Sequence, residues 1–228
     1  LYYVSEGDRA QAHTLLDESF ALFNEVGDKE NIANCLSLSG VFALSEEDTA
    51  SARSLTAQAL ALFQEMKLQG TALPLYAVAE VAAVEGDTTH ALTLYKQGIR
   101  VARKAGDQWM LTSSLERLAA AVATQGNYVW AAHLWGTAEA LREAIGTPLP
   151  PINRASYDRA VATTRTHLGA QAFTSAWTRG RTMSPEQALA TQGQGVFPAS
   201  TNGEQSSSPP TVSPAAYPDG LTAREVEV

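Results

Sequence analysis

Cysteine, aromatic residues and long apolar runs are all scarce in this sequence. Cys35 is the only cysteine among 228 residues, so the chain can form neither an internal disulfide nor a cysteine-rich metal site. Aromatic residues make up only 7% of the chain, and Ala and Leu dominate, which favours helices over sheets. The most apolar stretch, residues 75–84, is short and includes Glu80, which excludes it as a membrane span. We therefore expect a cytoplasmic protein without membrane association.

Residue patterns that carry catalysis or hold cofactors are absent as well. The sequence has no G-x-x-x-x-G-K-[ST] loop for nucleotide phosphates and no G-x-S-x-G motif of a serine hydrolase. None of the four histidines has a second His or a Cys three or four residues away, the spacing that a metal site on a helix requires. We therefore expect no enzyme, no cofactor and no metal ion.

Four similar segments recur along the first two thirds of the chain. Each opens on a polar residue that suits a helix N-cap, and these residues are spaced 40, 39 and 40 apart: Asp8, Asp48, Asp87 and Asn127. Small residues follow at two fixed positions on the same helical face: Ala12, Ala52, Ala91 and Ala131, then Ser19, Ala59, Gly98 and Ala138. Small residues at this spacing let a neighbouring helix approach closely.

A second helix is predicted between consecutive copies, over about residues 29–44, 69–84 and 108–124. The repeating unit is therefore a pair of helices joined by a turn. A unit of this size cannot bury its apolar face alone, so the copies must stack. We expect an all-α fold in which residues 1–147 form a right-handed superhelix of helix pairs.

The remaining residues divide into three parts. Over residues 148–192, Pro148, Pro150 and Pro151 interrupt the fourth copy, and three further helices are predicted to cap the stack, the last opening on a capping box at Ser184. Half of residues 193–220 are Gly, Pro or Ser, which predicts a flexible linker. Residues 221–228 begin another helix.

The run GDTTHALTLYKQG resembles the second helix of a tetratricopeptide repeat. That resemblance implies the stacked helix pairs already expected from the spacing. Two features depart from the family pattern. The interval of about 40 residues exceeds the usual 34, and the proline that ends a family repeat is missing after the first three copies.

The closing residues LTAREVEV are similar to the opening of the LuxR-type helix-turn-helix domain. The stretches WGTAEALREAIGTPLPP and AFTSAWTRGRTMSPEQALA also look like the region before that domain in large LuxR-type bacterial regulators related to the maltose activator. The resemblance implies that the chain is the repeat region of such a regulator, truncated as the helix-turn-helix domain begins. DNA would then be contacted only by the domain that follows Val228.

In a superhelix of this kind, the first helix of each pair lines the concave face. Counting by repeat position places seven residues there: Asn34, Ser37, Tyr76, Glu80, Trp109, Ser113 and Glu116. They predict a partly acidic groove suited to a basic or amphipathic peptide or a small polar effector. The alternative is that the two aromatic residues only pack against neighbouring helices.

Two functional hypotheses follow. In the first, the chain is a sensor segment that binds an effector or partner protein and controls the attached DNA-binding domain. In the second, it is a scaffold for protein–protein association without an effector. Homodimerisation is compatible with both hypotheses.

Of the tryptophans, Trp135 is expected in the core and Trp130 near the surface.

The formal net charge of −8 generates the first prediction. A negatively charged surface repels the phosphates of DNA, so the chain is expected not to bind duplex DNA at physiological salt. A gel-shift assay with random-sequence duplex measures this directly. Tight binding that weakens as salt rises would overturn it.

Overall fold

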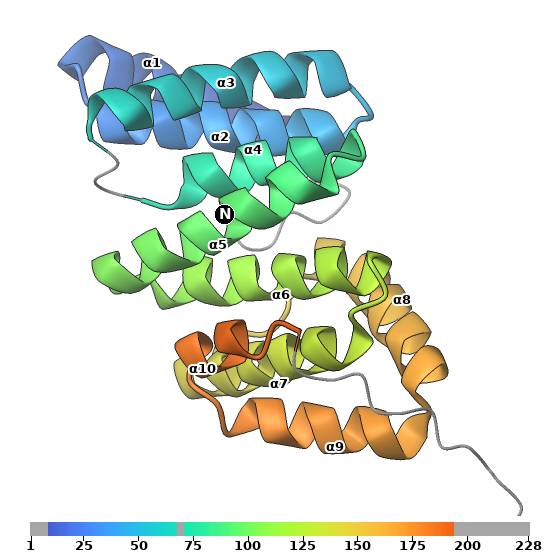
Figure 1. Ribbon diagram of the computed structural model, residues 1–228. Helices are drawn as coiled ribbons and strands as arrows, with labels where there is room; N and C mark the ends of the chain where they lie inside the picture. Colours follow the sequence, from blue (N-terminus) through green and yellow to red (C-terminus); the bar gives the residue numbers. More distant parts are fainter. Residues whose placement is uncertain (1–8, 68–70, 194–228) are drawn as a thin grey trace, which may run out of the picture. The chain divides into compact units, whose positions relative to one another are not determined.

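The computed structural model describes residues 9–67 and 71–193, and over these residues it is all-helical, as the sequence predicts (Figure 1). Residues 194–228, which include nearly all of the predicted linker and the start of the last helix, lie outside the described residues. The described helices are α1 (Arg9–Val26), α2 (Lys29–Ser45), α3 (Thr49–Glu65), α4 (Leu73–Val84), α5 (Thr88–Ala105), α6 (Gln108–Thr124), α7 (Tyr128–Ile145), α8 (Pro151–Leu168), α9 (Ala170–Arg181) and α10 (Pro185–Ala190).

Aspartate side chains begin most of the repeat helices. In each case the carboxylate accepts a backbone N–H from the first turn of the helix, which satisfies a donor that the helix itself cannot; these residues are Asp28, Asp48, Asp87 and Asp107. The predicted caps at Asp48 and Asp87 are thus confirmed. Asn127 precedes α7 but its side chain makes no capping hydrogen bond, and Asp8 lies outside the described residues.

Consecutive helices pack against one another throughout the stack. Alternate helices also touch, since α4 contacts both α2 and α6, and α6 contacts α8. Figure 1 shows α4, α5, α6 and α7 following one another down the stack, with α2 between α3 and α4 in this view. This is the arrangement of stacked helix pairs that the repeat predicts. The right-handed superhelical twist stays a prediction.

The small residues predicted at two fixed positions of each copy form a stripe along the helix that contacts the neighbouring helices. The residues of the stripe that are fully buried are Ala52, Ala59, Ala91, Ala131 and Ala138. The larger residues between them, at the middle of the same face, are buried too: Leu16, Thr56, Tyr95 and Trp135. Ser19 is the exception, because it is only half-buried and its hydroxyl donates to the carbonyl of Leu15 in its own helix.

The three C-terminal helices gather around α7, since α8, α9 and α10 all contact it. The capping box predicted at Ser184 begins α10. Trp130 lies under this short helix, where its indole Nε1 donates to the carbonyl of Ala188 at 2.9 Å, and the residue is only 3% exposed. The expectation that Trp130 lies near the surface was therefore wrong, because α10 folds back over it.

Two glycines allow α7 and α9 to cross with their backbones in contact. A Cβ atom added at Gly136 would collide with the carbonyl oxygen of Trp177, and one at Gly180 would collide with the backbone of His133. The hydroxyl of Thr137 donates to the carbonyl of Gly180 at 2.8 Å across the same crossing. Only glycine fits at these two positions.

Among the described helices, none combines the length and apolarity needed to cross a membrane.

Replacing Gly136 by Ala is predicted to destabilise the fold by about 1–3 kcal/mol, because the backbones of α7 and α9 must separate. Gly98→Ala is the matched control. Its Cβ would lie 3.7 Å from Ser114 Oγ and 3.8 Å from Leu75 Cβ, which are ordinary contacts, so better helix propensity should stabilise this variant by about 0.5–1 kcal/mol. Urea unfolding compares the two. Equal stability of both variants would contradict the close crossing.

Candidate functional site

A polar network joins four helices at the centre of the stack. Glu80 in α4 accepts the phenolic hydrogen of Tyr95 in α5 at 2.5 Å and pairs with Arg117 Nε in α6 at 3.3 Å. The Arg117 guanidinium also donates to the hydroxyl of Tyr76 at 3.2 Å and to Oδ1 of Asn153 in α8 at 3.0 Å. One carboxylate and one guanidinium therefore connect α4, α5, α6 and α8.

The electrostatics of this network fix its protonation state. Burial, followed by the charge of Glu80, raises the pKa of Tyr76 to about 12 and that of Tyr95 well above its usual value. The carboxylate of Glu80, with a smaller contribution from the Tyr76 hydroxyl, raises the pKa of Arg117. At neutral pH the two phenols are uncharged and the guanidinium is charged.

A second, deeper ion pair joins α6 to α7. Arg142 binds Glu116 through both nitrogens, with Nε at 2.5 Å from Oε1 and Nη2 at 2.7 Å from Oε2. The side chains are only 9% and 8% exposed. The remaining nitrogen of Arg142 approaches the carbonyls of Thr147 and Pro148, at 3.4 and 3.5 Å. The pair therefore also positions the turn between α7 and α8.

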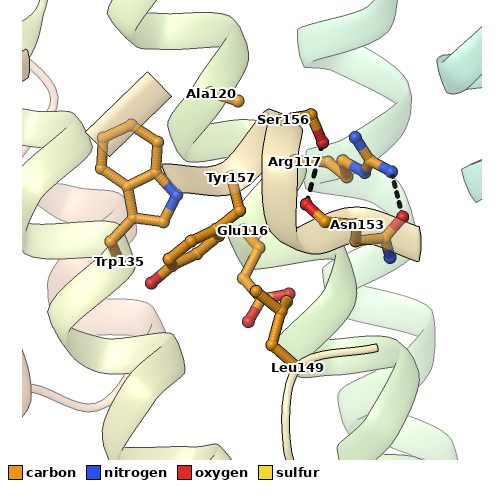
Figure 2. Close-up of a pocket in the computed structure, with 8 residues that line it drawn as sticks. All are labelled: Glu116, Arg117, Ala120, Trp135, Leu149, Asn153, Ser156 and Tyr157. Atoms are coloured by element: carbon orange, nitrogen blue, oxygen red, sulfur yellow. Dashed lines mark hydrogen bonds between the residues drawn. The ribbon is translucent and has the colours of Figure 1, made fainter. Parts of the chain in front are cut away.

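A cavity of about 60 Å³ lies beside this ion pair, between α6, α7 and α8 (Figure 2). Its lining residues are Glu116, Arg117, Ala120, Trp135, Leu149, Asn153, Ser156 and Tyr157. A larger hollow of about 440 Å³ shares Glu116, Leu149 and Tyr157 with it and continues along the end of α7. Because Glu143 and Arg154 on its rim are exposed, the hollow is open to solvent. Its volume lies within the range of small-molecule sites, about 300–1,000 Å³.

Trp135 and Tyr157 form the aromatic wall of the cavity, with ring centroids 6.1 Å apart in an edge-to-face arrangement. Trp135 is fully buried, and its Nε1 has no hydrogen-bond partner among the described residues. A buried donor left without a partner costs about 1–3 kcal/mol. Figure 2 shows the indole nitrogen on the side of the ring that faces Tyr157.

The structure brings together three of the seven residues that the sequence assigned to a groove. Tyr76 and Glu80 belong to the network at Arg117, and Glu116 to the ion pair beside the cavity. Ser37 is fully buried and donates to the carbonyl of Ala33 at 2.7 Å, so its assignment to an open groove was wrong.

The other three residues line neither hollow. Ser113 is buried, and Asn34 and Trp109 are half-buried. Sequence reasoning missed five residues that define the site: Arg117, Trp135, Arg142, Asn153 and Tyr157. The sequence carries no clear signal for the two arginines, because Glu116 directly precedes Arg117 and Glu143 directly follows Arg142, so each already has an acidic neighbour.

No family model, curated protein or solved structure matches this chain. What the site can do therefore follows from its residues. Among the described residues there is no group of three or more acidic, His or Cys side chains placed to hold a metal ion. The carboxylates of Glu80, Glu116 and Glu139 are each paired with an arginine. The arrangement is suited to binding.

Breaking the buried pair is predicted to be costly, because Arg142→Met leaves the carboxylate of Glu116 buried and unpaired. The expected loss is about 3–5 kcal/mol, and the double variant Glu116→Gln with Arg142→Met should recover most of it. Arg103→Met is the control, since its pair with Glu186 is 62% and 45% exposed and should contribute at most about 1 kcal/mol. Urea unfolding measures all three. A double variant as unstable as Arg142→Met alone would show that the pair is not the cause.

Proposed function

We propose that this chain is the effector-binding regulatory segment of a bacterial transcriptional regulator of the LuxR type, acting on an attached DNA-binding domain. The observation that carries the binding part of the proposal is the hollow at α6, α7 and α8, which has the volume of a small-molecule site and adjoins a smaller cavity with a buried donor on its wall. The regulatory part is supported by the similarity of LTAREVEV to the opening of a helix-turn-helix domain. That segment lies outside the described residues.

The placement of α8 is what would let a bound effector act at a distance. This helix contacts α6 through Asn153 and Arg117, and it contacts α7 through Tyr157 and Trp135. An effector in the hollow touches all three helices, so its binding energy depends on where α8 lies. An effector that binds more tightly to one position of α8 than to another increases the population of the position that it prefers.

The second candidate function is a scaffold for association, and one surface favours it. Three large apolar residues on α1 are exposed, Leu15, Leu22 and Val26. They are seven and four residues apart, so they share one face of the helix. An exposed apolar face of this kind is typical of a protein contact. A dimer formed through it would need no effector.

A thermal-shift screen separates the two functions. An effector present at 100 times its Kd should stabilise the chain by about 2.7 kcal/mol and raise the melting temperature accordingly. The scaffold instead predicts no hit and a concentration-dependent dimer in light scattering, which Leu22→Glu should dissociate. A screen of small metabolites without a hit, together with such a dimer, would reject the effector proposal.

A further inference from the structure

We infer that the cavity between α6, α7 and α8 takes an uncharged group with a hydrogen-bond acceptor, such as a carboxamide or another carbonyl, which accepts from the indole N–H of Trp135. This inference rests on the proposed function, because it names the chemical class of the effector at that site.

Trp135 carries a buried donor without an acceptor in the described part of the chain, unlike two other tryptophans of the C-terminal region. Trp130 and Trp177 both donate through their indole nitrogens, to the carbonyl of Ala188 at 2.9 Å and to Oε2 of Glu139 at 2.6 Å. Trp135 is more deeply buried than either, yet its Nε1 has no partner among the described residues and its ring lines the cavity. Indole nitrogen can only donate, so the missing partner must be an acceptor.

The charges around the cavity disfavour a charged ligand. Glu116 and Arg117 on the wall are already paired, with Arg142 and Glu80. Burial raises the pKa of Tyr157, and the carboxylates of Glu116 and Glu139 raise it further against a smaller lowering by Arg142, so the surroundings disfavour a negative charge at this hydroxyl. An anion would meet the same repulsion, and an ammonium group has no acceptor to offer Trp135. An uncharged acceptor fits both conditions.

The cavity has room for a small head group and opens toward a larger hollow. About 60 Å³ is several times the roughly 10–15 Å³ that one water molecule needs, so the cavity admits a group of a few heavy atoms. Ala120, Leu149 and the two rings give it apolar walls. The 440 Å³ hollow continues from Leu149 and Tyr157 toward solvent. The head group of the ligand would therefore sit against Trp135, with the rest of the molecule in the outer hollow.

The test observes the indole N–H directly, by heteronuclear NMR of the full chain labelled with ¹⁵N-tryptophan. Acetamide is the probe, and acetate is its matched control because it has nearly the same size but carries a charge. A probe this small binds weakly, so each is titrated to high millimolar concentration. The signal of Trp135 is assigned with Trp135→Phe or, if that variant does not fold, by elimination with Trp130→Phe, Trp177→Phe and Trp109→Phe.

The expected result is a saturable downfield shift of the Trp135 indole signal with acetamide and none with acetate. The Trp130 signal should stay in place, since that donor is already bonded. Ala120→Leu, which fills the cavity, should abolish the shift. Ala121→Leu is the matched control on the same helix, because Ala121 does not line the cavity and the shift should survive.

A Trp135 signal that does not move with acetamide, or that moves equally with acetate, would overturn the inference. So would a cross-peak from the Trp135 indole to a long-lived water that stays unchanged throughout the acetamide titration. The last would mean that water alone satisfies the donor. If the thermal-shift screen yields an effector that leaves the Trp135 signal in place, the proposed function stands and this inference fails. If Trp135 responds to acetamide, the chemical class is supported even before an effector is known.

Discussion

Close approach between neighbouring helices is the constraint on which the rest of this structure depends. A helix pair of about 40 residues has too little apolar surface to fold alone, so each pair is stable only when pressed against the next. Alanine or glycine at fixed positions of the second helix makes that contact possible, as at Ala91 and Gly98 in α5. At the crossing of α7 and α9 the requirement becomes absolute, because Gly136 and Gly180 face backbone atoms.

The polar cluster is a consequence of the same packing. Because alternate helices lie side by side, residues 40 apart in the sequence come close in space, as Tyr76, Glu116 and Ser156 do on α4, α6 and α8. Arg117 and Tyr157 are related by the same interval. Two adjacent register positions of the 40-residue interval therefore supply five of the polar and aromatic residues of the site.

Local signals predicted most of the fold, because caps and small-residue spacing act within one or two turns of a helix. The bounds of α6 agree with the sequence expectation, whereas α4 begins at Leu73, later than expected, with Pro74 in its first turn. The site was predictable only in part. Counting by repeat found Glu80 and Glu116, but their arginine partners depend on how distant helices cross. Ser37 was wrongly assigned to the groove, because a serine hydroxyl can also be buried when it donates to a carbonyl of its own helix, here that of Ala33.

The acidic wall of the outer hollow links the site to the C-terminal helices. Glu139 accepts from Trp177 and from Arg181, and Glu143 pairs with the same arginine, so α9 holds two of the three carboxylates that line the hollow. A ligand that contacts this wall changes the surroundings of Arg181, and α9 is tied to α7 by backbone contact and so has little freedom to adjust alone. Any strain imposed there must be shared with α8 and α10, the two other helices packed on α7. The hollow is thus placed where a bound small ligand would act on the whole C-terminal group of helices.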